Sequence, residues 1–402
     1  RRNVLIGAAG AAGLAGAGAW WYSQRPPEPA PDKSFTPTAE FPNRLRVPSA
    51  EGFFGVYDVT QNFTISAKST QEAIVPGKPA TMLAYEIESA GKTWRNPVLR
   101  LKKGAAIKAK HWNGLTETSI IHWHGLIADS NNDGHPHYAV KAGETYEYQF
   151  AVPNRAATYW YHPHPHQFTG KQVYLGLGGL FIVEDDDEIA LQKALDLKLG
   201  ETDIPLVLHD RRLDAQGQLV FNPTDEDKAD GFLGQQVLVN WTPKPFFEAA
   251  TRLYRFRVLN ASNARMYKLA FLNGKTPVPF QVIANDGGLL NAAQNASEVF
   301  LSPAERVEVL LDLRNAKPGD TLTLASVAFD PMEHEDGPPG ADKKDEKKDA
   351  KNDEKPAEKS AHAMHGKGDD KKAADKGDKE AKDNKPDIPE KSEEHTSELQ
   401  SR

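Results

Sequence analysis

Short apolar or alternating runs separated by Gly, Pro and Asn fill the chain from about residue 41 to residue 328. Alternation with a period of two residues, bounded by turn residues, is typical of β-strands with one face in a core. The clearest runs are Thr81–Ile87, Val98–Leu101, Thr145–Phe150 and Leu180–Val183, then Pro205–Leu208, Gln236–Val239, Tyr254–Leu259, Phe280–Ala284 and Val307–Leu313. Helical periodicity is sparse, and its best candidate, Asp187–Leu199, separates these two groups.

This pattern predicts an all-β protein with two tandem β-sandwich domains. We assign residues 41–187 to the first domain, residues 188–203 to a short helical linker and residues 204–330 to the second domain. Each domain is long enough to bury a core of ordinary size.

Charge divides the chain near residue 330. Residues 331–402 carry 16 Lys and Arg and 21 Asp and Glu, whereas the first 330 residues carry 33 and 35 and are nearly neutral. Residues 331–391 have no sustained apolar face, so we expect a disordered charged tail. The near-neutral body argues against a nucleic-acid partner, because such a protein would present a basic excess.

Both ends are predicted to lie outside the fold. Residues 1–30 begin with Arg1 and Arg2 before a Gly/Ala-rich apolar run, which resembles a twin-arginine export signal. We therefore expect a periplasmic or otherwise exported protein with no stable membrane association after signal removal; the alternative is a retained signal anchor. Residues 392–402 resemble a translated sequencing adapter, with an ordinary polar C-terminus as the alternative.

Cysteine is absent from the chain. Its absence excludes disulfides, thiolate zinc sites, iron–sulfur clusters and cysteine nucleophiles within these 402 residues.

Seven of the 13 histidines lie between residues 122 and 166, and they include two H-x-H pairs, His122 with His124 and His162 with His164. On a strand, residues i and i+2 face the same side about 6.6 Å apart. This separation is awkward for chelating one ion but suits two neighbouring metals, so two such pairs predict a metal cluster. Imidazoles without thiolates suit copper, zinc, iron or nickel, and affinity favours copper. A zinc hydrolase site stays possible, and a single H-x-H pair alone would more often be a surface accident.

Several segments around these histidines resemble the first domain of bacterial three-domain multicopper oxidases, nearest to the periplasmic cuprous oxidases and laccase-like enzymes. The segments are Asn113–Gly125, Tyr159–His166 and Gly176–Asp185. Others resemble that family's second domain, namely Leu238–Asn240, Arg257–Arg265, Asp286–Leu290 and Leu301–Val309. The resemblance covers about residues 45 to 328 and implies cupredoxin-like Greek-key sandwiches.

The resemblance also implies roles for individual residues. His122 would bind the type 2 copper, His124 and His162 one type 3 copper, and His164 the other. Asp133 matches the acidic residue that supplies protons during dioxygen reduction; the alternative is an ordinary turn residue before a glycine. Lesser expectations are an outer or surface role for His166, exposed loop positions for His135 and His137, structural roles for His111 and His209, and aromatic walls of the site from Trp123 and Trp160.

Members of this family reduce O2 to water with electrons taken from a reducing substrate, such as a phenol or Cu(I), through a type 1 copper held by two His and one Cys. The chain has no cysteine and no H-x-x-H-x-H or H-C-H motif after residue 166. We therefore expect domains 1 and 2 of a truncated oxidase, carrying half of the trinuclear copper site and inactive alone. The alternative is a non-catalytic cupredoxin-like protein that binds copper or acts as a periplasmic scaffold.

Overall fold

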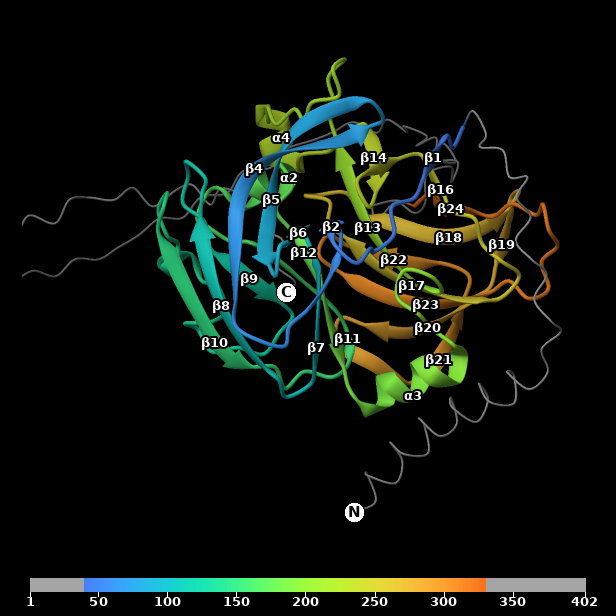
Figure 1. Ribbon diagram of the computed structural model, residues 1–402. Helices are drawn as coiled ribbons and strands as arrows, with labels where there is room; N and C mark the ends of the chain where they lie inside the picture. Colours follow the sequence, from blue (N-terminus) through green and yellow to red (C-terminus); the bar gives the residue numbers. More distant parts are fainter. Residues whose placement is uncertain (1–39, 330–402) are drawn as a thin grey trace, which may run out of the picture. The chain divides into compact units, whose positions relative to one another are not determined.

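The computed structural model describes residues 40–329, and strands account for most of its regular structure (Figure 1). The prediction of an all-β protein is confirmed. The helices are short: α2 (Thr169–Tyr174), α3 (Asp186–Leu195), α4 (Asp225–Asp230) and the 3-10 turn η1 (Pro136–Tyr138). None of the helices in the described part of the chain is long and apolar enough to span a membrane. The predicted export signal, charged tail and adapter segment lie outside the described residues.

The first sandwich is built from a six-stranded sheet, in the order β10-β8-β4-β5-β6-β2, and a five-stranded sheet, in the order β3-β7-β12-β11-β9. Its strands are β2 (Gly52–Phe53), β3 (Val56–Asp58), β4 (Phe63–Val75), β5 (Lys78–Ser89), β6 (Lys92–Arg95), β7 (Val98–Lys102), β8 (Ala106–Asn113), β9 (Ile121–His124), β10 (Thr145–Ala151), β11 (Ala157–Pro163) and β12 (Gly179–Glu184). Parallel pairs such as β4 with β8 and β7 with β12 show that the chain crosses between layers.

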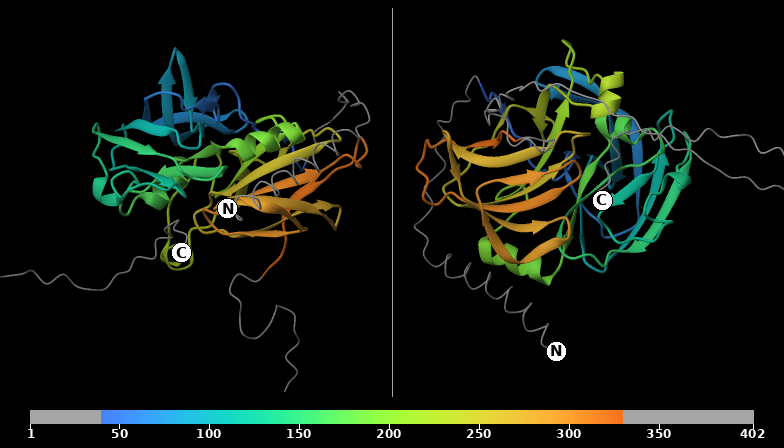
Figure 2. Two further views of the ribbon diagram at one scale, coloured as in Figure 1. Left: turned by 90° about the horizontal axis from the view of Figure 1, so that it is seen from below. Right: turned by 180° about the vertical axis from the view of Figure 1, so that it is seen from behind.

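The second sandwich combines a seven-stranded sheet, β15-β14-β13-β17-β23-β20-β21, with a smaller sheet of β19, β18, β22 and β24 (Figure 2). Its strands are β13 (Asp203–Arg211), β14 (Gln236–Val239), β15 (Thr242–Pro243), β16 (Pro245–Phe246), β17 (Leu253–Asn260), β18 (Tyr267–Asn273), β19 (Thr276–Val278), β20 (Phe280–Asn285), β21 (Gly288–Ala296), β22 (Val299–Leu301), β23 (Arg306–Asp312) and β24 (Thr323–Ser326). The short strand β1 (Asn43–Arg44), within the range assigned to the first domain, pairs with β16 instead.

Each of the nine strand runs expected from the sequence overlaps a strand of the structure. The expected helix is α3, which starts where the Asp185 side chain accepts a hydrogen bond from the Glu188 N–H. It ends earlier than predicted because Asp196 takes a left-handed backbone conformation with φ of 51°. The domain boundaries themselves stay a prediction.

A buried ionic cluster joins the two sandwiches through α3. Arg255 and Arg257 of β17 hydrogen-bond both Glu188 of α3 and Glu308 of β23. Glu308 Oε1 also accepts hydrogen bonds from the backbone N–H and hydroxyl of Thr158 on β11, at 2.8 and 2.7 Å. Burial alone would raise the pKa of Glu188, but the charges of Arg255 and Arg257 outweigh it and lower that pKa to about 2. The cluster therefore carries charged carboxylates at neutral pH and ties β11 to the second sandwich.

Candidate metal centre

Strand register brings the two H-x-H motifs together. Strands β9 and β11 pair antiparallel, with His162 directly opposite His122 and Trp160 opposite His124. Directly opposite residues point to the same face of a sheet, as do residues i and i+2 along a strand. His122, His124, Trp160 and His162 therefore share one face.

The opposite face of the same strands packs into the core of the first sandwich. Ile121, Trp123 and Tyr161 all belong to that core, and the Trp123 ring lies 5.3 Å from the ring of Tyr148. The expectation that Trp123 forms a wall of the site is therefore wrong, because alternation turns it away from its two histidine neighbours. Trp160 does line the site, with its ring centroid 4.2 Å from that of His162.

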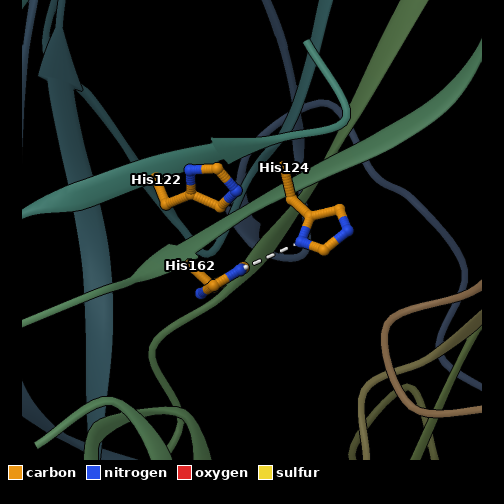
Figure 3. Close-up of side chains that lie close together, drawn as sticks. All are labelled: His122, His124 and His162. Atoms are coloured by element: carbon orange, nitrogen blue, oxygen red, sulfur yellow. Dashed lines mark hydrogen bonds between the residues drawn. The ribbon is translucent and has the colours of Figure 1, made fainter. Parts of the chain in front are cut away.

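Three imidazoles converge closely enough to hold a metal ion. One nitrogen from each of His122, His124 and His162 lies within 4.8 Å of the others (Figure 3). Nδ1 of His124 is 3.3 Å from Nε2 of His162. With metal–nitrogen bonds of about 2 Å, this spacing fits one ion with an N–metal–N angle of about 110°. The residues thus fit a copper or zinc ion, both of which imidazole binds well.

Backbone carbonyls fix which nitrogens face the centre. Nδ1 of His122 donates to the carbonyl oxygen of Asp133 at 2.6 Å, and Nδ1 of His162 donates to that of Pro163 at 2.9 Å. A carbonyl can only accept, so each ring carries its proton on Nδ1 and keeps a lone pair on Nε2. Hydrogen bonds of this kind orient the histidine ligands of metal sites.

Burial keeps the two inner rings neutral. Desolvation lowers the pKa of His124 to about 2, with a further contribution from the positive charge of Arg306. Desolvation also lowers the pKa of His162 well below its usual value, assisted by His122 and His124. Neutral imidazoles are the form that donates a lone pair to a metal.

His164 lies beside this group without belonging to it. It is half-buried, and its ring centroid is 5.3 Å from that of His122 and 6.0 Å from that of His162. Its backbone N–H donates to the Ile120 carbonyl at 3.0 Å, which continues the ladder between β9 and β11 beyond Pro163. The four histidines singled out by the sequence therefore lie together.

The structure places Asp133 next to His122. Besides the backbone hydrogen bond, its carboxylate Oδ1 lies 3.4 Å from His122 Nδ1, and its side chain is 45% exposed. Gly134 follows with φ of 83°, and a Cβ there would overlap the Ile121 carbonyl oxygen of β9. Only glycine lets this loop lie against the strand.

The other histidines of the described region stand apart from the three-histidine group. His135, His137 and His166 are exposed, as expected. His111 and His209 are buried; Nδ1 of His111 donates to the Ile65 carbonyl at 3.3 Å, and burial lowers the pKa of His111 to about 4.

Sequence reasoning missed one residue near the centre. Arg306 of β23 reaches Gly125, the neighbour of His124, from the second sandwich. The resemblance of Leu301–Val309 to the family's second domain gives Arg306 no role at the site, and no local pattern could reveal a contact between residues so distant in sequence.

Comparison with known proteins identifies the fold. Residues 69–188 match the multicopper oxidase family. The multicopper oxidase mco of Staphylococcus haemolyticus is 35% identical over 264 residues, which are 66% of this chain and 56% of that protein. The solved structure of the McoA multicopper oxidase from Aquifex aeolicus gives a TM-score of 0.65 and 45% identity, covering 70% of this chain and 60% of that one.

A cell division protein is also similar. FtsP of Escherichia coli is 33% identical over 228 residues, which are 57% of this chain and 46% of FtsP. The chain spans about half to three-fifths of the length of these relatives. Its fold is two tandem cupredoxin-like sandwiches. From the matched segment, these relatives and the likeness to solved oxidases together, the chain belongs to the multicopper oxidase family.

Proposed function

We propose that this chain contributes to a copper-dependent oxidase that takes electrons one at a time from a reducing substrate, such as a phenol or Cu(I), and reduces O2 to water. The observation that carries the proposal is the convergence of His122, His124 and His162 within 4.8 Å. Bound copper would supply one-electron redox chemistry and a place for O2 to bind. The protein would supply a rigid, water-poor set of imidazoles.

The proposed division of ligands is the one that the resemblance to the family implies, and one distance supports it. His124 and His162, whose facing nitrogens are 3.3 Å apart, would share one type 3 copper. His122 would bind the type 2 copper and His164 the second type 3 copper, which makes these four residues half of a trinuclear site. The 402 residues contain no cysteine for a type 1 site. We therefore expect negligible turnover of phenols or Cu(I) by this chain alone.

Asp133 is proposed as the proton-supplying residue. Its carboxylate lies 3.4 Å from Nδ1 of His122, and 45% of its side chain is exposed to water. A half-exposed carboxylate in this place can pass protons between solvent and the site.

Copper titration of the full chain tests the proposal. The chain without substitutions, called the parent below, should bind Cu(II) in a fixed stoichiometry. Competition with a chromophoric chelator and electron paramagnetic resonance measure this. His162→Ala should weaken binding by about tenfold or more, because loss of one ligand leaves the ion under-coordinated. His166→Ala, in the same motif but exposed, should bind like the parent. Equal binding by the parent and His162→Ala would contradict the proposal.

A second candidate is a non-catalytic protein that binds copper or acts as a scaffold, and the similarity to the cell division protein FtsP is the observation that favours it. A scaffold needs no metal, so the absence of stoichiometric copper from the parent would support a scaffold. An exported, periplasmic location is proposed for either protein, on the basis of Arg1 and Arg2 and the apolar run after them.

A further inference from the structure

Arg306 sends its side chain from the second sandwich to the first. Although it starts β23, its Nε donates to the carbonyl oxygen of Thr158 on β11 at 3.3 Å. Its Nη1 donates to the Ala304 carbonyl at 3.0 Å, and its Nη2 donates to the Asp286 carbonyl at 3.2 Å. The guanidinium is thus fixed by backbone groups of both sandwiches, and only 2% of the side chain is exposed.

The fixed guanidinium lies against the backbone beside His124. Gly125 has φ of 83°, and a Cβ built on it would be 2.6 Å from Nη2 of Arg306. The guanidinium therefore fills the space that a side chain at position 125 would need. The guanidinium also lies 5.7 Å from the centre of the ring of Tyr159, the residue before Trp160.

Asp286, the carboxylate that pairs with Arg306, is less buried than the guanidinium. Asp286 Oδ1 is 2.7 Å from Nη1, but the Asp286 side chain is 40% exposed. Water screens an exposed charge far more than a buried one. The pair is neutral in sum, but we expect the more buried cation to act on His124 more strongly than its more exposed partner.

We propose that Arg306 is a positioning residue that tunes the metal site of the first sandwich, its buried cation disfavouring Cu(II) relative to Cu(I) beside His124. The inference rests on the proposed copper site. The physical reason is that a fixed positive charge repels a doubly charged ion more strongly than a singly charged one. A site tuned in this way has a raised reduction potential and accepts electrons more readily.

Two opposite charge changes test the proposal in the full chain. Arg306→Gln leaves Asp286 without its cation, and Asp286→Asn leaves Arg306 without its anion. The dissociation constants of Cu(II) and Cu(I) are measured for each variant by competition with chelators selective for each ion. Arg306→Gln should shift the ratio about tenfold in favour of Cu(II), and Asp286→Asn should shift it about threefold in favour of Cu(I). If the two effects add, the double variant should lie about threefold from the parent ratio, in favour of Cu(II).

A purely structural role predicts a different result. Both variants would then weaken the binding of Cu(II) and Cu(I) alike and leave the ratio of the two dissociation constants unchanged. This result would overturn the proposal, and so would shifts of the ratio in the same direction in both variants. Arg306→Lys keeps the charge and should keep the ratio. Lys268→Gln is the control. It also removes one positive charge, from the Lys268–Glu298 ion pair of the smaller sheet, and should not change the ratio.

The two proposals can fail separately. If His162→Ala lowers copper binding but neither charge change alters the ratio of Cu(II) to Cu(I) affinity, the copper site is supported and the proposed role of Arg306 is wrong. If the parent binds no copper through its histidines, both are wrong. Should Arg306→Gln fail to fold, Asp286→Asn still decides, because its partly exposed carboxylate can be neutralised with little loss of packing.

Discussion

Nε2 of His162 lies 3.3 Å from Nδ1 of His124, although His162 is paired in the sheet with His122. The short contact is thus diagonal across the β9–β11 ladder. A diagonal pair can share one ion while the directly opposite His122 keeps its own lone pair for another. The sheet register therefore agrees with the proposed division of these ligands between two ions.

This relationship predicts that His124→Ala and His162→Ala lose the same copper ion. Each single variant should bind one equivalent fewer than the parent, and the double variant should lose no further equivalent, because the two residues act on one ion. Metal content after gel filtration, with His166→Ala as the control, measures this. A second equivalent lost in the double variant would show that the two imidazoles hold different ions.

The loop that carries Asp133 should depend on Gly134 for packing and not only for backbone freedom. Gly134 and Gly143 have similar φ angles of 83° and 78°, but a Cβ at Gly134 would overlap β9, whereas a Cβ at Gly143 meets nothing within 4 Å. Gly143→Ala should therefore lower the free energy of unfolding by about 1 to 2 kcal/mol, the cost of left-handed backbone alone.

Gly134→Ala should cost more than Gly143→Ala, on the order of 3 kcal/mol, since the overlap adds to the same backbone cost. It should also weaken copper binding, because it pushes away the Asp133 carbonyl that orients His122. Chemical denaturation and the copper titration measure the two effects. Equal stability losses in the two variants would mean that the loop simply moves aside.

The buried ionic cluster predicts a loss of stability in acid. Glu188 has its pKa lowered from 4.5 to about 2 in the folded protein, so its contribution is fully present above pH 4.5 and disappears as the pH falls toward 2. Glu188→Gln should flatten the pH dependence of the unfolding free energy in this window. At neutral pH it should cost about 3 kcal/mol or more, because it leaves buried arginines under-compensated.

The control for this prediction is Glu298→Gln. Glu298 pairs with Lys268 at 2.7 Å but is 49% exposed. Its loss should change the unfolding free energy by less than about 1 kcal/mol at any pH, because exposed ion pairs contribute little. An unchanged acid slope in Glu188→Gln would show that other carboxylates carry the effect.

Period-two alternation and the spacing of the histidines were enough to predict nine strand runs and a group of four imidazoles, because both are properties of a few neighbouring residues. The same alternation could have shown that Trp123, between His122 and His124, must face the core. Contacts set by tertiary packing could not be predicted. The pairing of β1 with β16 and the approach of Arg306 to Gly125 join residues about 200 positions apart, and they depend on how the two sandwiches dock.

Trp123 and Trp160 form a matched pair that separates packing from metal binding. Both are buried on neighbouring strands, and neither indole N–H has a hydrogen-bond partner among the described residues. Replacement by Phe therefore breaks no hydrogen bond at either position. It should lower the unfolding free energy by about 1 to 2 kcal/mol in both variants, the cost of the lost ring atoms.

Copper binding should respond to only one of the two substitutions. Trp160 packs on His162 with ring centroids 4.2 Å apart and contacts the apolar cluster that contains Val207 and Leu259 of the second sandwich. Trp160→Phe removes part of this support, so the ring of His162 gains freedom and copper affinity should fall about tenfold. Trp123→Phe alters the opposite face of the same sheet and should leave the affinity within about twofold of the parent, since it moves no ligand. If both variants lose affinity in proportion to their lost stability, the effect of Trp160 is general destabilisation and not support of the ligand.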